Sequence, residues 1–193
     1  MKKRMIFAIC REFGSDGHEI GKELSERLGI PLFDKEILER AAEASGVHID
    51  CLAKYDEKRQ KGFQASYLLS DDWRMGDRLF RIEAELIRNY AALGSCILVG
   101  RLADYILRDD PDCIKVLITA PFAQRTAIVA QRQNCSQEEA AKLVRHMDAQ
   151  RSAYYQCYSG GKWRHETEKD MILNRGSLGI EGCVDLLYHW AMR

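Results

Sequence analysis

Residues 5–29 decide the fold, and they read MIFAIC (5–10), REFGSDGHEIGK (11–22) and ELSERLG (23–29). An apolar run leads into a glycine-rich turn, and the turn opens a helix in which Ile20, Leu24 and Leu28 repeat every four residues. Glycines let a backbone approach an anion closely, and the first turn of a helix offers unpaired N–H groups and a positive dipole end. The stretch therefore predicts a buried strand over 5–10, a phosphate-binding turn and a helix over 17–28.

The turn departs from the standard phosphate-binding motif G-x-x-x-x-G-K-[ST]. Gly14 and Gly21 are too far apart for it, and Asp16 stands where a glycine would match Gly21 and Lys22. Residue 23 is Glu23, which has no hydroxyl for a magnesium ion. The alternative is an ordinary strand–turn–helix corner whose glycines only make a tight turn. The loop alone leaves both interpretations open.

Composition narrows the class of protein. A length of 193 residues with 46% hydrophobic residues suits one domain with a substantial core. Lys plus Arg equals Asp plus Glu at 29 each, so the formal net charge of zero gives no overall attraction to nucleic acid or to an anionic membrane. We therefore expect neither as a partner.

The seven cysteines are scattered and form no C-x-x-C pair, which argues against a zinc site or a disulfide framework. No apolar run approaches membrane-spanning length, and the first residues lead into a short core strand rather than a cleavable signal. These features predict a cytoplasmic protein.

Short apolar strands and helices alternate along the rest of the chain. Strands are predicted over 30–33, 96–99, 113–119 and 171–173, and helices over 35–45, 72–92, 102–108, 121–133, about twenty residues from Ser136, and 178–192. The polar segment from about 46 to 71 is expected to hold short helices and a loop. This alternation predicts a three-layer α/β/α fold with a five-stranded parallel sheet. Ligands of such folds bind at the carboxyl ends of the strands.

Two charged residues directly follow predicted strands. Asp34 is placed to hold a metal, accept a substrate hydroxyl or act as a base, and it also suits the N-cap of the next helix. The two roles can coexist. Arg101 follows Gly100 and is placed to fork onto a phosphate, with a surface ion pair to Asp104 as the alternative.

Basic side chains recur on the two helices between 121 and about 156, where they could clamp a transferring phosphate or form a solvated, ion-paired face. They are Arg125, Arg132, Lys142, Arg145 and Arg151, with Asp148 among them. Tyr154, Tyr155 and Trp163 follow, and suit either stacking on a base or packing. His18 is the only histidine in the glycine-rich loop and could donate to a phosphate.

Taken together, these motifs resemble the cytidylate kinase-like family, relatives of the nucleoside monophosphate kinases, over nearly the whole chain. The resemblance rests on REFGSDGHEIG (11–21), LFDKEI (32–37), VGRLADYIL (99–107), DAQR (148–151) with YY (154–155) and Trp163, and DMILN (170–174) with LGIE (178–181).

The resemblance implies a P-loop kinase fold in a single domain, 1–193, with a helical substrate-binding insertion at about 36–92 and a lid at about 132–165. It also implies transfer of the γ-phosphate of ATP, with Mg²⁺, to a small acceptor, foremost a nucleoside monophosphate such as CMP. By position it implies three groups of residues: catalytic Arg101, Arg145, Arg151 and Asp34; phosphate-binding Gly14, Ser15, Asp16, Gly17, His18, Gly21 and Lys22; and lid residues Arg125, Arg132, Asp148 and Tyr155. Asp16 and Asp34 are the candidate Mg²⁺ ligands.

The chain also departs from this family pattern. His18 falls near the place of the P-loop lysine, and Val99 stands where true cytidylate kinases show an Asp before Gly-Arg. The alternatives are therefore a catalytically silent nucleotide-binding regulatory module with a degenerate P-loop, or a protein that keeps only the fold. The long apolar helix at 72–92 could serve a homodimer or only the core.

Overall fold

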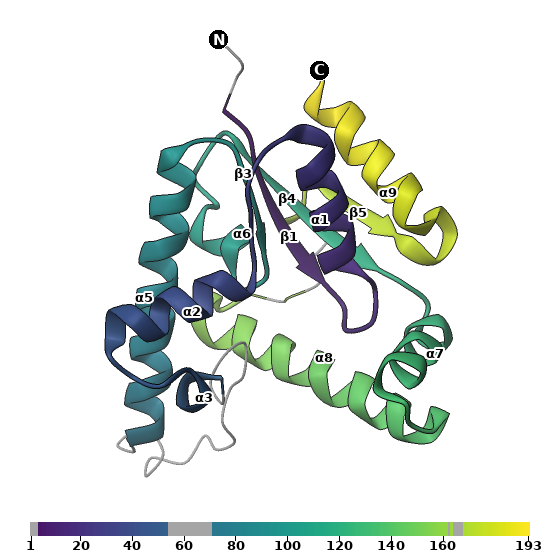
Figure 1. Cartoon of the computed structure of the whole chain (residues 1–193), viewed down its shortest axis with the longest axis horizontal. Helices are drawn as coiled ribbons and strands as arrows, with labels where there is room; N and C mark the ends of the chain where they lie inside the picture. The colour runs from purple at the N-terminus through teal and green to yellow at the C-terminus, as the bar shows by residue number, and fades with distance from the viewer. Residues whose placement is uncertain (1–3, 54–70, 162, 164–167) are drawn as a thin grey trace.

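The computed structural model describes residues 4–53, 71–161, 163 and 168–193, so much of the polar segment predicted at 46–71 lies outside the described residues. One parallel sheet of five strands lies at the centre (Figure 1), in the order β2-β3-β1-β4-β5. The strands are β1 (Ile6–Arg11), β2 (Leu32–Phe33), β3 (Cys96–Val99), β4 (Cys113–Thr119) and β5 (Met171–Asn174). The predicted five-stranded parallel sheet is confirmed.

The helices between the strands also follow the predicted order. They are α1 (Gly17–Leu28), α2 (Lys35–Ser45), α3 (Ile49–Leu52), α5 (Asp71–Leu93), α6 (Ala103–Ile106), α7 (Phe122–Gln133), α8 (Gln137–Ser159) and α9 (Arg175–Ala191). None of the helices in the described part of the chain is both long and apolar enough to cross a membrane.

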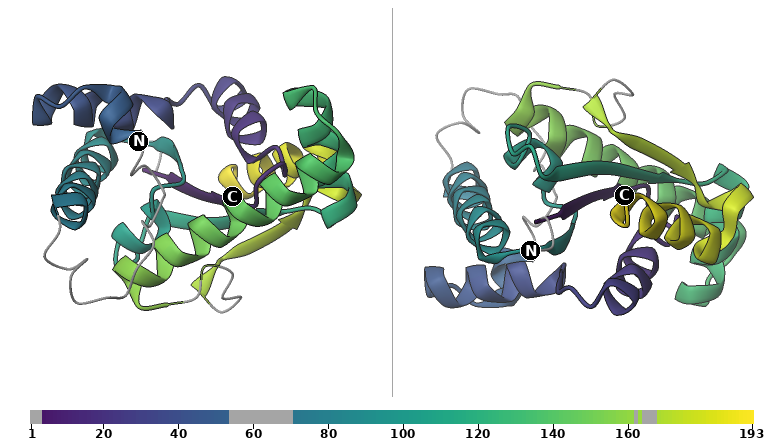
Figure 2. Two further views of the ribbon diagram at one scale, coloured as in Figure 1. Left: turned by 90° about the horizontal axis from the view of Figure 1, so that it is seen from below. Right: turned by 90° about the horizontal axis from the view of Figure 1, so that it is seen from above.

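The central strand β1 divides the core into two halves because successive side chains of a strand point to opposite faces. Phe7 and Ile9 pack with α1 and α9, whereas Ile6 and Ala8 pack with α5, α6 and α8. All four side chains are at most 1% exposed. Helices on both faces of the sheet give the predicted three layers, which Figure 2 shows from two directions.

Helix α8 positions the candidate site because it crosses near the carboxyl ends of the strands (Figures 1 and 2), while the start of β1 and the end of α9 lie on the opposite side. It begins with the predicted capping box, in which Ser136 accepts a hydrogen bond from the Glu139 N–H and the Glu139 carboxylate accepts one from the Ser136 N–H. The second basic helix of the sequence is therefore one continuous element that spans the edge of the sheet where ligands bind.

The last helix differs from its prediction. Helix α9 begins at Arg175 instead of 178, because the Asn174 side chain accepts a hydrogen bond from the Gly176 N–H and so caps an earlier start. Gly179, with φ of 71°, makes a kink inside it that only glycine adopts easily. This earlier start brings Arg175 next to the glycine-rich loop.

Candidate phosphate-binding site

The loop between β1 and α1 has a backbone shape that depends on its glycines. Gly14 has φ of +80°, and a Cβ added there would lie 2.9 Å from the carbonyl oxygen of Arg125. A Cβ at Gly17 would lie 2.5 Å from the Cβ of Arg11. The loop is thus pressed against α7 and folded back on its own strand, with the first turn of α1 at its end.

Ser15 stabilises the loop from inside. Its hydroxyl is fully buried and lies 2.9 Å from the carbonyl oxygen of Glu12 and 3.1 Å from that of Ile118. Because both neighbours are acceptors, the hydroxyl proton is directed inward. The side chain of Ser15, one of the predicted phosphate-binding residues, therefore stabilises the conformation of the loop.

Arg125 and Asp148 connect the loop to α7 and α8. The Arg125 guanidinium, 5% exposed, donates to the Asp148 carboxylate at 2.8 Å and to the Phe13 carbonyl at 3.0 Å. Asp148 also accepts a hydrogen bond from the Phe13 N–H at 2.9 Å. Arg125 pairs further with Glu12, 3.2 Å away. Arg125 and Asp148, both predicted as lid residues, thus fix the backbone of the loop at Phe13.

Asp16 ends the loop and is buried. It has φ of 60°, serves as the N-cap position of α1 without making a capping hydrogen bond, and its side chain is 1% exposed. One carboxylate oxygen lies 2.7 Å from Arg132 on α7, and the other lies 2.5 Å from Arg175 on α9. Asp16 therefore joins three elements at the mouth of the loop.

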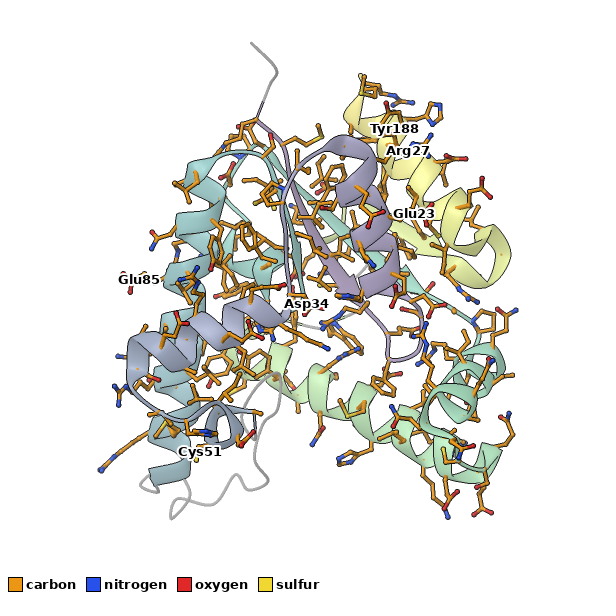
Figure 3. All side chains as sticks on the ribbon, viewed as in Figure 1. Glu23, Arg27, Asp34, Cys51, Glu85 and Tyr188 are labelled. Carbon is orange, nitrogen blue, oxygen red and sulfur yellow. The ribbon has the colours of Figure 1, made fainter. Side chains whose placement is uncertain are left out.

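Asp34 is a second acidic centre, at the start of α2 between the sheet and α8 (Figure 3). One oxygen accepts a hydrogen bond from Arg101 at 3.0 Å and lies 3.9 Å from Arg11. The other lies 2.7 Å from Nδ1 of His18, which is the second residue of α1. Although Asp34 occupies the N-cap position, its carboxylate makes no capping hydrogen bond. Its oxygens serve the arginines and the histidine instead.

Arg101 is held by buried acids rather than exposed to solvent. Its side chain is 3% exposed, and besides Asp34 it contacts Glu83 of α5 through Nε at 3.2 Å. Glu83 is fully buried and accepts a second hydrogen bond from the Tyr154 hydroxyl at 3.3 Å. The partners that the structure describes for Arg101 are thus Asp34 and Glu83, rather than the Asp104 that the sequence allowed. The backbone at Arg101 and Leu102 has φ of 50° and 55°, a strained conformation of the kind that gathers at functional sites.

Three arginines line one small cavity at the carboxyl ends of β1 and β3. Arg11, Arg101 and Arg151 line it together with the Cys10, Gly100, Leu102, Tyr154, Tyr155 and Trp163 side chains or backbone. Arg151 of α8 also donates to the Arg11 carbonyl at 3.1 Å. The cavity measures about 20 Å³, which is room for little more than one water molecule. It is a cationic site closed over by α8.

Three other predicted site residues lie away from the cavity. Arg145, on α8 like Arg151, stacks over the Phe122 ring with its guanidinium carbon 4.8 Å from the ring centre. Gly21 faces the sheet, where an added Cβ would lie 3.2 Å from Val99, and Lys22 is exposed on α1. The structure therefore brings Arg101 and Arg151 together and leaves Arg145, Gly21 and Lys22 outside the cavity.

Residues 6–177 match the family model described as the cytidylate kinase-like family. The chain belongs to the cytidylate kinase-like family. It is 25% identical over 183 residues to a cytidylate kinase of Methanothrix thermoacetophila, covering 94% of this chain and 95% of that one. This membership makes it a kinase-type phosphotransferase.

Solved structures support the same fold for this member of the cytidylate kinase-like family. An uncharacterized protein from Eubacterium ventriosum is 27% identical, with a TM-score of 0.75 over 98% of this chain and 99% of that one. A shikimate kinase from Bacteroides thetaiotaomicron is 12% identical, with a TM-score of 0.61 over 99% and 100% of the two chains. The second likeness establishes a P-loop kinase fold and nothing about the acceptor.

Membership of this kinase family implies ATP and Mg²⁺ as cofactors. The described residues suit the phosphates of ATP but not a magnesium ion. The glycine loop, the start of α1 and the nearby arginines have the backbone shape and charge that phosphates need. For Mg²⁺, both candidate carboxylates, Asp16 and Asp34, are already paired with arginines. In the described part of the chain, no group of three or more His, Cys, Asp and Glu is placed to hold a metal. These residues as arranged do not form a magnesium site.

Tyr155, predicted as a lid residue, lies in a buried polar cluster beneath the cavity. Its hydroxyl donates to Asp104 at 3.1 Å, and Lys169 contacts both of them. Burial, together with the Asp104 carboxylate, raises the pKa of Tyr155 above its usual value, so the hydroxyl stays protonated. Burial likewise raises the pKa of the neighbouring Cys10 thiol, which keeps it unreactive. The cluster supports the cavity floor.

Four residues that the structure places at the site were not among the predicted site residues. Arg11 and Glu83 contribute to the acidic and basic network around Arg101, Arg175 pairs with Asp16, and Lys169 supports Tyr155. One signal was available for Glu83, because the pattern Leu79, Ile82, Leu86 places position 83 on the apolar side of α5. An acid on an apolar face indicates a buried partner.

Proposed function

We propose that this protein transfers the γ-phosphate of ATP to a small acceptor, and that the acceptor is a nucleoside monophosphate such as CMP. The observation that carries the proposal is the cavity where Arg11, Arg101 and Arg151 meet beside the glycine loop. The loop and the start of α1 would bind the donor phosphates, and the cavity would bind the acceptor phosphate. ATP as its Mg²⁺ complex is the proposed donor.

Arg101 is suited to an acceptor phosphate because its position is fixed before any ligand arrives. Glu83 and Asp34 hold its Nε and one Nη atom, so the guanidinium loses little freedom on binding. Charged groups that are already oriented stabilise phosphoryl transfer most effectively, since the protein need not rearrange during the reaction. We assign Arg101 to the acceptor phosphate and Arg151 to the transferring group.

Helix α8 would act as the lid. The cavity of about 20 Å³ is smaller than a phosphate group, so the acceptor can enter only when Arg151 and its helix move. The contacts that would break are the hydrogen bond from Arg151 to the Arg11 carbonyl and that from the Phe13 N–H to Asp148. Closure over bound substrates would exclude water from the transfer, as kinase lids do.

A second candidate function is a nucleotide-binding regulatory module without catalysis. The observation that favours it is that Asp16 and Asp34 are both occupied by arginines, in a loop without the usual lysine and hydroxyl. This candidate retains phosphate binding and lacks transfer. It would bind ATP through the same loop, so binding alone does not separate the two functions.

The test is ADP formation from ATP with Mg²⁺ across a panel of nucleoside monophosphates and small hydroxylated acceptors, run beside thermal unfolding with and without ATP. We expect CMP-dependent turnover. At a ligand concentration about 100 times the Kd, binding adds about 2.7 kcal/mol to the free energy of unfolding, so ATP should also raise the melting temperature. A thermal shift without turnover for any acceptor would favour the regulatory module. The absence of both a thermal shift and turnover would contradict both candidate functions and would indicate a protein that keeps only the kinase fold.

A further inference from the structure

The Asp16 carboxylate lies between two arginines at the end of the glycine loop. Its side chain is 1% exposed, at the point where the loop meets the start of α1. Arg132 reaches it from α7 and Arg175 from α9, at 2.7 Å and 2.5 Å. A negative group enclosed by two guanidinium groups at a helix N-terminus is the arrangement by which proteins bind phosphates.

The fit between Asp16 and its two arginines is imperfect. Both carboxylate oxygens are buried within ion-pair distance, yet neither accepts a well-aligned hydrogen bond from the described residues. The residue also has φ of 60°, a conformation that glycine adopts more easily than aspartate. A larger anion with more oxygens could engage both guanidinium groups at better angles.

We propose that Asp16 is a specificity-determining residue that occupies the phosphate position between Arg132 and Arg175, so that a nucleotide must displace its carboxylate to bind. The proposal rests on the proposed function only in taking the loop as the site of nucleotide phosphates. The two arginines are reachable for such an exchange, because their side chains are 50% and 24% exposed. A bound phosphate and the Asp16 carboxylate cannot both occupy the arginines without strong repulsion between like charges.

This arrangement has consequences for which ligands the loop accepts. A ligand with a single phosphate would only exchange the Asp16 carboxylate for another small anion at the two arginines, so its net gain in binding free energy would be small. A di- or triphosphate brings further oxygens to the amides of the loop and the start of α1 and can offset the displacement. Asp16 would therefore lower affinity for all phosphates while favouring polyphosphates over monophosphates at the loop.

The test measures binding, with Asp16→Asn and Asp16→Gly as the variants and isothermal titration with ATP, ADP and AMP as the readout. We expect both variants to bind ATP at least tenfold more tightly than the parent chain, with a smaller gain for AMP. Asp16→Gly also relieves the positive φ, so it should fold at least as well as the parent. Affinity that is unchanged or weaker in both variants would overturn the proposal.

The matched control is Asp185→Asn, which removes the same charge from another aspartate–arginine pair. Asp185 lies on α9 and pairs with Arg27, which is in the last turn of α1 and stacks on Tyr188 of α9. Arg27 and Tyr188 lie at the end of α1 that is away from the loop (Figure 3). The ATP affinity of Asp185→Asn should stay within twofold of the parent. An equal gain in this control would reduce the effect to net charge and overturn the proposal, as would a failure of Asp16→Gly to fold, because Asp16 would then be a structural tie.

This result is separable from the proposed function. If the parent chain phosphorylates CMP and Asp16→Gly shows no gain in ATP affinity, the role of Asp16 fails and the kinase assignment stands. If Asp16→Gly binds ATP more tightly and no acceptor is phosphorylated by either protein, the role of Asp16 stands and the assignment fails.

Discussion

The two cationic regions at the carboxyl ends of the strands are built in opposite ways. In the cavity, Arg101 is 3% exposed and is fixed by Asp34 and Glu83, which come from elements outside the loop. At the glycine loop, Arg132 and Arg175 are partly exposed and are held by Asp16, which belongs to the loop itself. The first arginine is oriented for a ligand, and the other two are occupied until a ligand arrives.

A buried acid beside an arginine can therefore have either of two effects on ligand binding. An acid that contacts one side of the guanidinium orients it. An acid placed at the entrance of the anion site competes with the ligand. The following predictions test that contrast, beginning with the largest expected effect.

Replacing Arg101 by alanine should cause the largest loss. The substitution removes the proposed acceptor contact and leaves Asp34 and Glu83 without their shared partner. We expect kcat/KM for the acceptor to fall by about 10²–10³-fold, as for the loss of one oriented charge at a transition state. Steady-state kinetics with varied CMP at saturating ATP would measure it. Arg108→Ala, at a half-exposed position after α6, is the control and should leave the rate near that of the parent.

Replacing Glu83 by glutamine should weaken the fixed region through stability. The change leaves Arg101 with one buried carboxylate in place of two and disturbs the hydrogen bond from Tyr154. We expect a loss of about 1–3 kcal/mol in the free energy of unfolding, typical of an altered buried polar network. Urea denaturation would measure it. Stability equal to that of the parent would show that Arg101 is not held as the contrast requires.

Replacing Arg151 by alanine should slow transfer more than replacing Arg145, although both lie on α8. Arg151 lines the cavity, whereas Arg145 stacks on Phe122. We expect kcat to fall by about tenfold or more for Arg151→Ala, within the range of charge stabilisation in phosphoryl transfer, and to change little for Arg145→Ala. Single-turnover rates would compare them. A larger loss of kcat for Arg145→Ala than for Arg151→Ala would contradict the prediction and indicate that transfer takes place near Arg145.

The smallest effect concerns the buried thiols of Cys96 and Cys113, the first residues of strands β3 and β4. Burial raises the pKa of Cys96 to about 11 and of Cys113 to about 12, so both stay protonated at neutral pH. They should react with a thiol reagent far more slowly than the exposed Cys51, and acceptor should not change their rates. Labelling followed by mass spectrometry of the peptides would compare them. Fast labelling of Cys113 would show an opening that the closed fold does not contain.

Much of the fold was predictable because short apolar runs alternate with helices whose ends carry clear signals. The apolar run before the loop, the capping box at Ser136 and the glycine after α1 each set a boundary that the structure confirms. Asp34 and Arg101 were also predictable as neighbours, since the carboxyl ends of parallel strands share one edge of the sheet.

The partners of the charged residues were not predictable from the sequence. Arg125 and Arg151 look alike in the chain, yet one is bound inward to Asp148 and the other lines the cavity. Asp16 was predicted as a candidate Mg²⁺ ligand, but Arg175 on α9, the last helix of the chain, pairs with it. Which acid meets which arginine depends on the packing of α7, α8 and α9, and that long-range packing leaves no periodic pattern in the sequence.

The most direct test is a crystal structure of the protein with a non-hydrolysable ATP analogue and CMP. We expect the donor phosphates to lie against residues 13–18 and the CMP phosphate to contact Arg101, with α8 shifted from its present position and closed over both ligands. A structure with the loop still filled by Asp16, and both ligands bound away from the loop and the cavity, would contradict it.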